Sequence, residues 1–237
     1  MKKYVSVLLV ALILGACALP CYAAASVSAP GIRKFGLDSI VQTLELTDER
    51  GDIPFPTFYH KAWGGQKQPL VLYFHGSGTV GTYPARALFQ FVPIGLSLLM
   101  QGRRYNSMVV YDADLAYYGA QECAETVSQY IDYAVSNGNV DKNRIYLIGF
   151  SYGGLAVSNL VSVFPTRFAA AVGLEAMSSV RAIPFIDVYT VKASDGHVPD
   201  PAVSQEYMQI PIGEHEMLPL NAALFRGWMD WLFAQRR

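Results

Sequence analysis

From Ser39 to the C-terminus, short apolar runs alternate with longer segments in which apolar residues recur at helical spacing. Continuous apolar runs predict strands buried on both faces, and the 3.6-residue recurrence predicts amphipathic helices. The strands are expected at 69–74, 107–114, 144–150, 168–174, 185–191 and 206–212, and the helices at 85–102, 120–138, 152–164 and 218–237. This alternation predicts an α/β fold with a mainly parallel central sheet and helices on both faces.

Two segments before the first buried run follow a different pattern. Residues 39–46 and 54–61 alternate apolar and polar side chains, which predicts antiparallel strands at one edge of the sheet. Pro93 and Gly95 lie within the first predicted helix and are expected to disturb it. The runs 168–174 and 185–191 are separated by about ten residues, a typical short connection, so no sizeable cap domain is expected there.

The first 23 residues differ in character from the rest of the chain. Lys2 and Lys3 precede a long apolar stretch, and the small residues around Ala23 offer a cleavage site. The apolar stretch is shorter than the roughly 20 residues that span a bilayer. We therefore expect a secretory signal peptide at 1–23, one globular domain at 24–237 and an exported protein, periplasmic or extracellular.

A second interpretation of the N-terminus is a lipoprotein signal at 1–16. Leu14-Gly15-Ala16-Cys17 resembles a bacterial lipobox, which would attach Cys17 to the outer membrane through lipid. Plain secretion is favoured, because Cys21-Tyr22-Ala23 is also a usable cleavage site. After cleavage there, Cys123 is left without a partner cysteine, and it is expected to be a packed thiol within a helix.

Composition and charge narrow the function classes. The chain has 237 residues, of which 52% are hydrophobic and 16% charged, so it is long and apolar enough for one large globular domain. Its formal net charge is −1, and its Lys and Arg residues form no cluster larger than a pair such as Arg103-Arg104. Nucleic-acid binding has no electrostatic basis in this sequence.

One glycine-rich loop has two interpretations. Residues 76–81, Gly-Ser-Gly-Thr-Val-Gly, follow a buried strand and satisfy the G-x-G-x-x-G spacing of a dinucleotide-binding turn. The same loop begins His75-Gly76, as an oxyanion loop of acyl-transfer enzymes often does. Both functions require backbone N–H groups directed at an anion. A dinucleotide site also needs an acidic residue about 20 residues further on, and Asp112 comes too late, so the oxyanion interpretation is favoured.

A second motif supports the same interpretation. Gly149-Phe150-Ser151-Tyr152-Gly153 matches G-x-S-x-G and lies where a predicted buried strand ends and a predicted helix begins. A nucleophile elbow needs this context, because its serine takes a strained turn that exposes the hydroxyl group. The alternative is a glycine-rich turn with an incidental serine.

The expected partners of Ser151 follow it in the order acid, then histidine. His215 precedes the last predicted helix and is the favoured base. Two acids come after strands downstream of the serine, Glu175 after the run 168–174 and Asp195 after the run 185–191. Asp195 is favoured, because the shorter acid is the usual one and its strand leads directly to that of His215. Glu175 stays open as its rival.

From Leu70 to the C-terminus the chain resembles the α/β-hydrolase superfamily. Within it, "NRIYLIGFSYGG", "FAAAVGL" and "WLFAQRR" look like secreted esterases and predicted peptidases related to polyhydroxybutyrate depolymerases and feruloyl esterases. The resemblance implies an α/β-hydrolase fold in which the backbone N–H groups of Ser77 and Tyr152 form the oxyanion hole. It also implies that His75 orients the loop, and that no cofactor is needed.

These residues predict a secreted carboxylic-ester hydrolase. Ser151 would attack the ester carbonyl, His215 would take its proton, and Asp195 would hold the imidazole. No spacing of His, Asp and Glu around residues 213–217 indicates a closed metal site. A missing cap would leave an open cleft, suited to bulky or polymer-attached esters. The alternatives are a serine peptidase of the same fold and a catalytically inactive binding module on the cell surface.

Overall fold

The computed structural model describes residues 32–35, 41–46, 57–62, 64–79, 85–111, 118–137, 139–176, 178, 180–190, 206–211 and 213–237. Within these residues the strands form one sheet in the order β1-β2-β3-β5-β4-β6-β7-β8-β9. Their bounds are β1 Ile32–Phe35, β2 Val41–Leu46, β3 Thr57–His60, β4 Gln68–Phe74, β5 Asn106–Val110, β6 Val140–Phe150, β7 Ala170–Leu174, β8 Phe185–Thr190 and β9 Glu206–Ile210.

The sheet has an antiparallel side and a larger parallel side. β1, β2 and β3 pair antiparallel with one another, and β3 pairs antiparallel with β5. From β5 through β4, β6, β7 and β8 to β9, every pair is parallel. The predicted mainly parallel sheet with antiparallel strands at one side is confirmed, and β1 is an additional strand that the sequence pattern did not predict.

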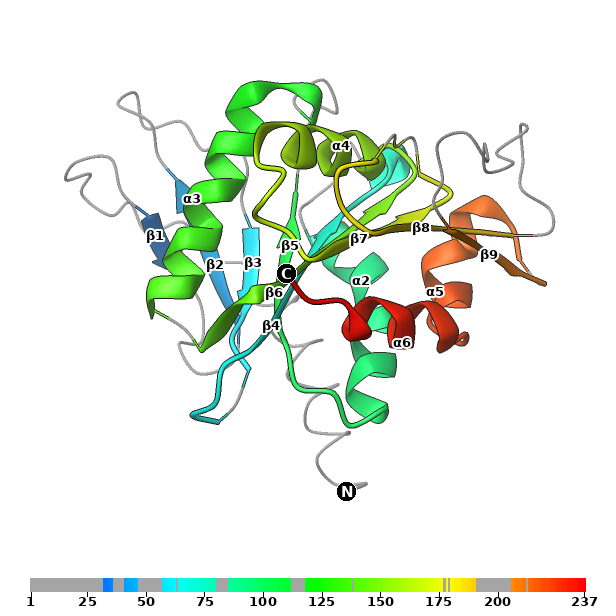
Figure 1. Ribbon diagram of the computed structural model, residues 1–237, viewed down its shortest axis with the longest axis horizontal. Helices are drawn as coiled ribbons and strands as arrows, with labels where there is room; N and C mark the ends of the chain where they lie inside the picture. The colour runs from blue at the N-terminus through cyan, green and yellow to red at the C-terminus, as the bar shows by residue number, and fades with distance from the viewer. Residues whose placement is uncertain are drawn as a thin grey trace.

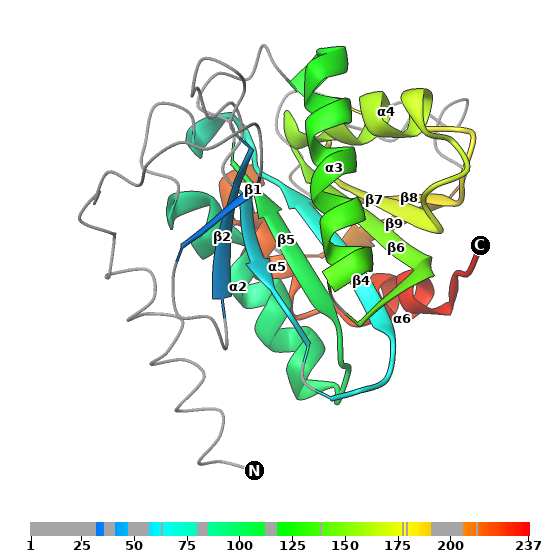
Figure 2. The ribbon, with the colours of Figure 1, turned by 90° about the vertical axis from the view of Figure 1, so that its left-hand side faces the viewer.

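Helices cover both faces of the sheet (Figures 1 and 2). α3 Gln121–Asn137 and α4 Gly153–Val163 lie on one face, and α2 Ala85–Met100, α5 Leu218–Ala222 and α6 Gly227–Ala234 lie on the other. The central strands alternate accordingly: Leu70 and Leu72 pack with α3 and α4, whereas Val71 and Tyr73 pack with α2. In the described part of the chain, none of the helices is long and apolar enough to cross a membrane.

Pro93 does not interrupt α2, which continues from Ala85 to Met100. The proline removes one backbone donor and costs about 3 kcal/mol in a helix interior. The buried apolar face of the helix, with Phe91, Ile94 and Leu98, offsets that cost. Gly95 has a packing role, because its carbonyl accepts a hydrogen bond from the Tyr105 hydroxyl at 2.9 Å.

The C-terminal segment forms two helices where one was predicted. α5 ends at Ala222 and α6 begins at Gly227. The indole N–H of the fully buried Trp228 donates to the carbonyl of Ala222 at 3.0 Å, and the same carbonyl accepts from the Phe225 N–H at 3.1 Å, so both bonds fix the turn between the two helices. Burial of Trp228 therefore outweighs the helical periodicity that runs through this segment.

Candidate active site

Ser151 lies in a tight turn between β6 and α4. Its φ is 51°, in the left-handed region that an L-residue other than glycine, asparagine or aspartate seldom adopts. The Ser151 N–H donates to the carbonyl of Leu174 at 3.1 Å, and the Ser151 carbonyl accepts from the Gly154 N–H at 3.0 Å. These bonds hold the backbone in a strained conformation, as a nucleophile elbow requires.

The two glycines of the motif allow the backbone to pack closely around this turn. A methyl group at Gly149 would lie 2.7 Å from the carbonyl oxygen of Gly153, and one at Gly153 would lie 2.2 Å from the carbonyl oxygen of Phe74. Both distances are shorter than van der Waals contact, and the colliding atoms belong to the backbone. The helix that follows Ser151 can therefore approach β4 and β6 only with glycine at these positions.

The glycine-rich loop after β4 lies against the turn. A methyl group at Gly76 would lie 2.9 Å from the ring of Phe150 and 3.1 Å from the Cβ of Ser151. His75 is fully buried, and its Nδ1 donates to the carbonyl of Gly76 at 2.9 Å. Its ring also packs between Tyr111 and Tyr118, each 5.4 Å away between ring centroids. His75 thus fixes the loop, as the resemblance implied.

Two backbone N–H groups beside Ser151 are suited to bind an anion. Ser77 follows Gly76 and begins a short 3₁₀ helix, Ser77–Thr79. Tyr152 is the N-cap residue of α4, and the first N–H groups of a helix have no acceptor within the helix. Ser77 lies in the glycine-rich loop and Tyr152 directly follows Ser151, so both residues are next to the turn.

His215 also lies at this turn, although it follows a different strand, β9. It begins a 3₁₀ helix, His215–Met217, that precedes α5. Its imidazole packs on the ring of Phe150, the residue before Ser151, with centroids 5.0 Å apart and planes inclined by 33°. Its Nδ1 lies 2.6 Å from Oε2 of Glu175, the shortest described contact between an imidazole and a carboxylate.

Glu175 is held rigidly where β7 ends. It is 2% exposed and has a φ of 42°. Its Oε1 accepts hydrogen bonds from the N–H and the hydroxyl of Thr190, both at 2.7 Å. Burial alone would raise the pKa of this carboxyl, but the hydrogen bonds from His215 and Thr190 and the charge of His215 hold it below its ordinary value. Glu175 is therefore an ionised partner for an imidazolium.

His215 pairs with Glu175, the rival acid of the sequence analysis. Asp195 lies outside the described residues, so its expected role stays a prediction. The signal for Glu175 was present in the sequence, because it directly follows a buried strand, as Ser151 does.

A metal site finds no support among these side chains. Over the ranges that the structure describes, no three His, Cys, Asp or Glu residues are grouped so that they could hold a metal ion. Cys123 is fully buried in α3 within the apolar core, and it lies outside the site.

A family model and a curated relative each match part of the chain. The model of the prolyl oligopeptidase family matches residues 112–215, the stretch from the end of β5 to His215. Acylamino-acid-releasing enzyme 2 of Oryza sativa subsp. japonica is 25% identical over 125 residues. The matched part is 50% of this chain and 16% of the rice protein, so this chain corresponds to a small part of that relative.

Solved structures match most of the chain. A thermostable esterase superposes with a TM-score of 0.66 at 19% identity, covering 84% of this chain and 64% of the esterase. The acylaminoacyl peptidase of Pyrococcus horikoshii superposes with a TM-score of 0.52 at 14% identity, covering 86% of this chain and 41% of the peptidase. The finer resemblance to polyhydroxybutyrate depolymerases and feruloyl esterases stays a prediction.

Proposed function

This chain has the α/β-hydrolase fold, and on that premise we propose that it is a serine hydrolase that cleaves carboxylic esters. The observation that carries the proposal is the 2.6 Å contact between His215 and the buried Glu175, beside a serine held in a left-handed turn. Nucleophile, base and acid each follow a different strand, β6, β9 and β7, at the same edge of the sheet. Their order along the chain is serine, acid, histidine, which is the order of this fold.

The proposed reaction proceeds in two steps. The Oγ atom of Ser151 bonds to the ester carbonyl carbon while His215 takes its proton, and His215 then gives that proton to the departing alkoxide. Water attacks the acyl-enzyme with His215 again acting as base, which releases the carboxylic acid and restores Ser151. The carboxylate of Glu175 keeps the Nδ1–H tautomer of His215 and stabilises its imidazolium.

The negative oxygen of the tetrahedral intermediate would be bound by the backbone N–H groups of Ser77 and Tyr152. Preorganised donors of this kind contribute about 3–4 kcal/mol of transition-state stabilisation each. The contact between Gly76 and Ser151 favours this role for the glycine-rich loop over nucleotide binding, because the loop faces the nucleophile.

Esters are the favoured substrates and peptides are the alternative. Of the two solved structures described above, the thermostable esterase has the higher TM-score. Ester cleavage at this site needs only a serine, a base and an oxyanion hole. β7 and β8 are joined by residues 175–184 alone, so no cap is inserted at that connection. An open site of this kind is suited to bulky or polymer-attached esters. The prolyl oligopeptidase match and the rice relative favour peptides or acylated amino acids.

Replacement of Ser151 tests the proposal. Ser151→Ala should abolish turnover of p-nitrophenyl esters and labelling by a fluorophosphonate, because the acyl intermediate cannot form. The matched control is Ser162→Ala, which removes an exposed hydroxyl from α4, the helix that follows Ser151, and should leave both unchanged. Labelled peptides identified by mass spectrometry should contain Ser151.

The outcome on two substrate panels separates the competing functions. Turnover of esters with little turnover of aminoacyl-nitroanilides supports the esterase, and the reverse result supports the peptidase. A folded wild-type protein that cleaves neither substrate panel and does not bind the fluorophosphonate would refute both enzymatic functions and favour an inactive binding module.

We also propose that the protein is exported through the signal at residues 1–23. Intact-mass measurement of the mature protein tests this directly. A mature chain beginning at Ala24 supports plain secretion, and a lipidated chain beginning at Cys17 supports the lipoprotein alternative. Cys17→Ser should have no effect in the first case and should release the protein from membranes in the second.

A further inference from the structure

A second carboxyl group lies beside Glu175 and has no part in the reaction described above. Asp187 is in the middle of β8 and pairs in register with Gly173 of β7. Because position 173 carries no side chain, the carboxyl group of Asp187 occupies the space above it. A methyl group at Gly173 would lie 3.0 Å from Oδ1 of Asp187 and 2.9 Å from the ring of Phe185. The Asp187 carboxyl is thus built into the sheet.

The strand that carries Asp187 also holds Glu175. The Glu175 N–H donates to the carbonyl of Val188 at 2.8 Å, and the Glu175 carboxylate is bound by Thr190, three residues after Asp187. Any change in the charge or position of Asp187 therefore acts on the segment that orients the acid of the site.

One oxygen of Asp187 is buried without a hydrogen-bond partner. Oδ1 is inaccessible to solvent, and the structure gives it no donor. An ionised oxygen in such a place is poorly solvated, so the group is stabilised in its neutral form. Burial first, and the negative charge of Glu175 second, raise the pKa of Asp187 to about 7, although the N–H of Val188 partly opposes this.

We propose that Asp187 is a positioning residue that acts on His215 through Glu175 and sets the pH range in which Ser151 is activated. The inference rests on the proposed function, because it concerns the same histidine. When Asp187 carries a proton, His215 faces the single charge of Glu175. When Asp187 loses its proton, a second negative charge lies behind Glu175 and stabilises the imidazolium.

Among the described residues, few other groups near Asp187 can produce this effect. On β7 and the residue after it, the charged neighbour is Glu175, and beyond it lies His215. Tyr207 is the register partner on β9, and Tyr189 is two residues further along β8; both are phenols. On the helix over this face, α4, the buried residues are glycine and apolar residues, so no charge of that buried set faces Asp187.

The sign of the effect follows from the role of His215 as a base, which must be neutral to take a proton. A second negative charge favours the protonated form of a neighbouring base, so its presence is expected to move the acid limb of kcat/KM upward. Asp187→Asn keeps the shape of the side chain and removes the charge. The acid limb should therefore move to lower pH by about 0.5 unit or more, while kcat on the plateau changes little.

The experiment compares kcat/KM from pH 5 to pH 9 for the wild type, Asp187→Asn and Glu206→Gln. Glu206→Gln is the matched control. It removes one negative charge from the neighbouring strand β9, at an exposed position in register with Ile186. A limb that moves in Asp187→Asn alone supports the proposal. A limb that stays in place, or that moves equally in Glu206→Gln, overturns it.

A second measurement does not depend on turnover. In protein labelled with ¹³C at the aspartate carboxyls, the Asp187 signal is the one that Asp187→Asn removes. It should titrate near pH 7 in the wild type and at lower pH in Glu175→Gln, because the neighbouring charge is then gone. An unchanged midpoint in Glu175→Gln overturns the coupling. If the wild type cleaves no ester, the proposed function fails, and this titration still decides whether Asp187 responds to Glu175.

Discussion

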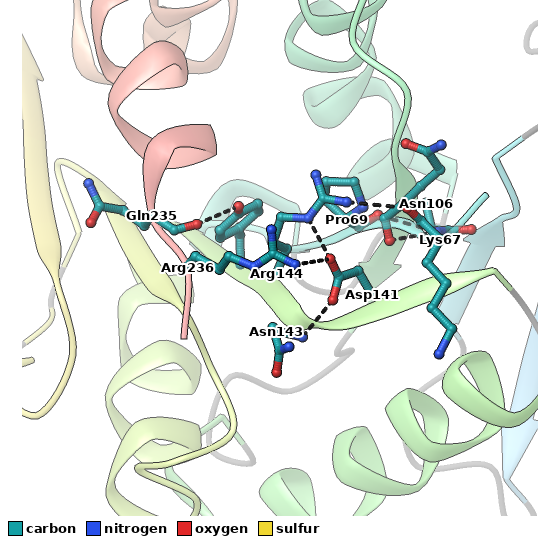
Figure 3. Close-up of polar contacts among 10 residues, drawn as sticks. Lys67, Pro69, Asn106, Asp141, Asn143, Arg144, Gln235 and Arg236 are labelled. Carbon is teal, nitrogen blue, oxygen red and sulfur yellow. Dashed lines mark hydrogen bonds and ion pairs between the residues drawn. The ribbon is translucent and has the colours of Figure 1, made fainter.

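The two ends of the parallel sheet both hold buried carboxylates, but they surround them differently. At the carboxyl end, Glu175 follows β7 and pairs with His215, and its negative charge acts on Asp187 within β8. At the amino end of β6, Asp141 lies among arginines (Figure 3). At the carboxyl end the negative charge is balanced by a proton, whereas at the amino end the arginines balance it at every accessible pH.

The surroundings of Asp141 join three segments of the chain. Its Oδ2 accepts from Nε of Arg144 at 2.7 Å and from Arg236 at 3.4 Å, and its Oδ1 accepts from the N–H of Asn143 at 3.0 Å. Arg144 also donates to the carbonyl of Lys67, and Figure 3 shows how these residues converge from before β4, from β6 and from the C-terminus. Burial would raise the pKa of Asp141, but these hydrogen bonds and charges hold it below its ordinary value.

This difference indicates that the two ends of one sheet have different functions. Arginine keeps its charge at every accessible pH, so the Asp141 cluster stabilises the fold without responding to neutral pH. Burial first, and the negative charge of Glu175 second, raise the pKa of Asp187 to about 7, so the end of the sheet beside Ser151 responds to pH near neutrality.

The largest effect is expected from removing the acid at the catalytic end. Glu175→Gln should lower kcat by about 10³–10⁴-fold with the fold intact, because the neutral amide no longer stabilises the imidazolium of His215. Asp195→Asn should cost only a few-fold. Ester turnover measured after circular dichroism has shown that both variants are folded would decide between them. The opposite ranking would mean that Asp195 is the acid.

A smaller effect, on stability instead of turnover, is expected at the other end. Asp141→Asn should lower the free energy of unfolding by about 1–2 kcal/mol, because charge-assisted hydrogen bonds from Arg144 are weakened. Its kcat should match that of the wild type. Urea unfolding and ester turnover on the same samples test the two halves of this expectation, and a loss of turnover in a folded variant would contradict the division between the two ends.

The contribution of Asp141 should also depend on pH in a predictable direction. Its pKa is lowered in the folded state, so its stabilisation is complete above the ordinary aspartate value near 4 and is lost as the pH falls toward the folded value. The difference in unfolding free energy between wild type and Asp141→Asn should shrink below about pH 4 and stay constant from pH 6 to pH 8. A difference that changes near pH 7 would refute this assignment.

The smallest effect is expected for the second arginine of the cluster. The Arg236 side chain is 64% exposed and its contact with Asp141 is 3.4 Å, whereas the Arg144 side chain is 28% exposed and 2.7 Å away. Arg236→Ala should cost less than about 0.5 kcal/mol, and Arg144→Ala should cost more. Urea unfolding of the two variants compares them directly, and equal losses would show that exposure does not control these pairs.

The elbow could be predicted from the sequence because its determinants are local. Gly149, Ser151 and Gly153 are neighbours in the chain, so the motif can be recognised in the sequence, although the backbone that requires glycine at 153 belongs to Phe74. The apolar runs likewise predict the parallel strands, since burial on both faces leaves a continuous apolar pattern. The break between Ala222 and Gly227 could not be predicted, because it depends on the burial of Trp228 in the core.

Taken alone, the sequence determined the α/β class and the candidates for nucleophile, loop and base at Ser151, Gly76 and His215, because each is encoded by periodicity or by residues adjacent in the chain. Only the tertiary structure decided which acid meets His215. Glu175 and Asp195 both follow buried strands, so the sequence pattern treats them alike, and the choice depends on which carboxylate lies within hydrogen-bond distance of one ring nitrogen. The same is true of Asp187, whose proximity to Glu175 arises from strand pairing between residues far apart in the chain.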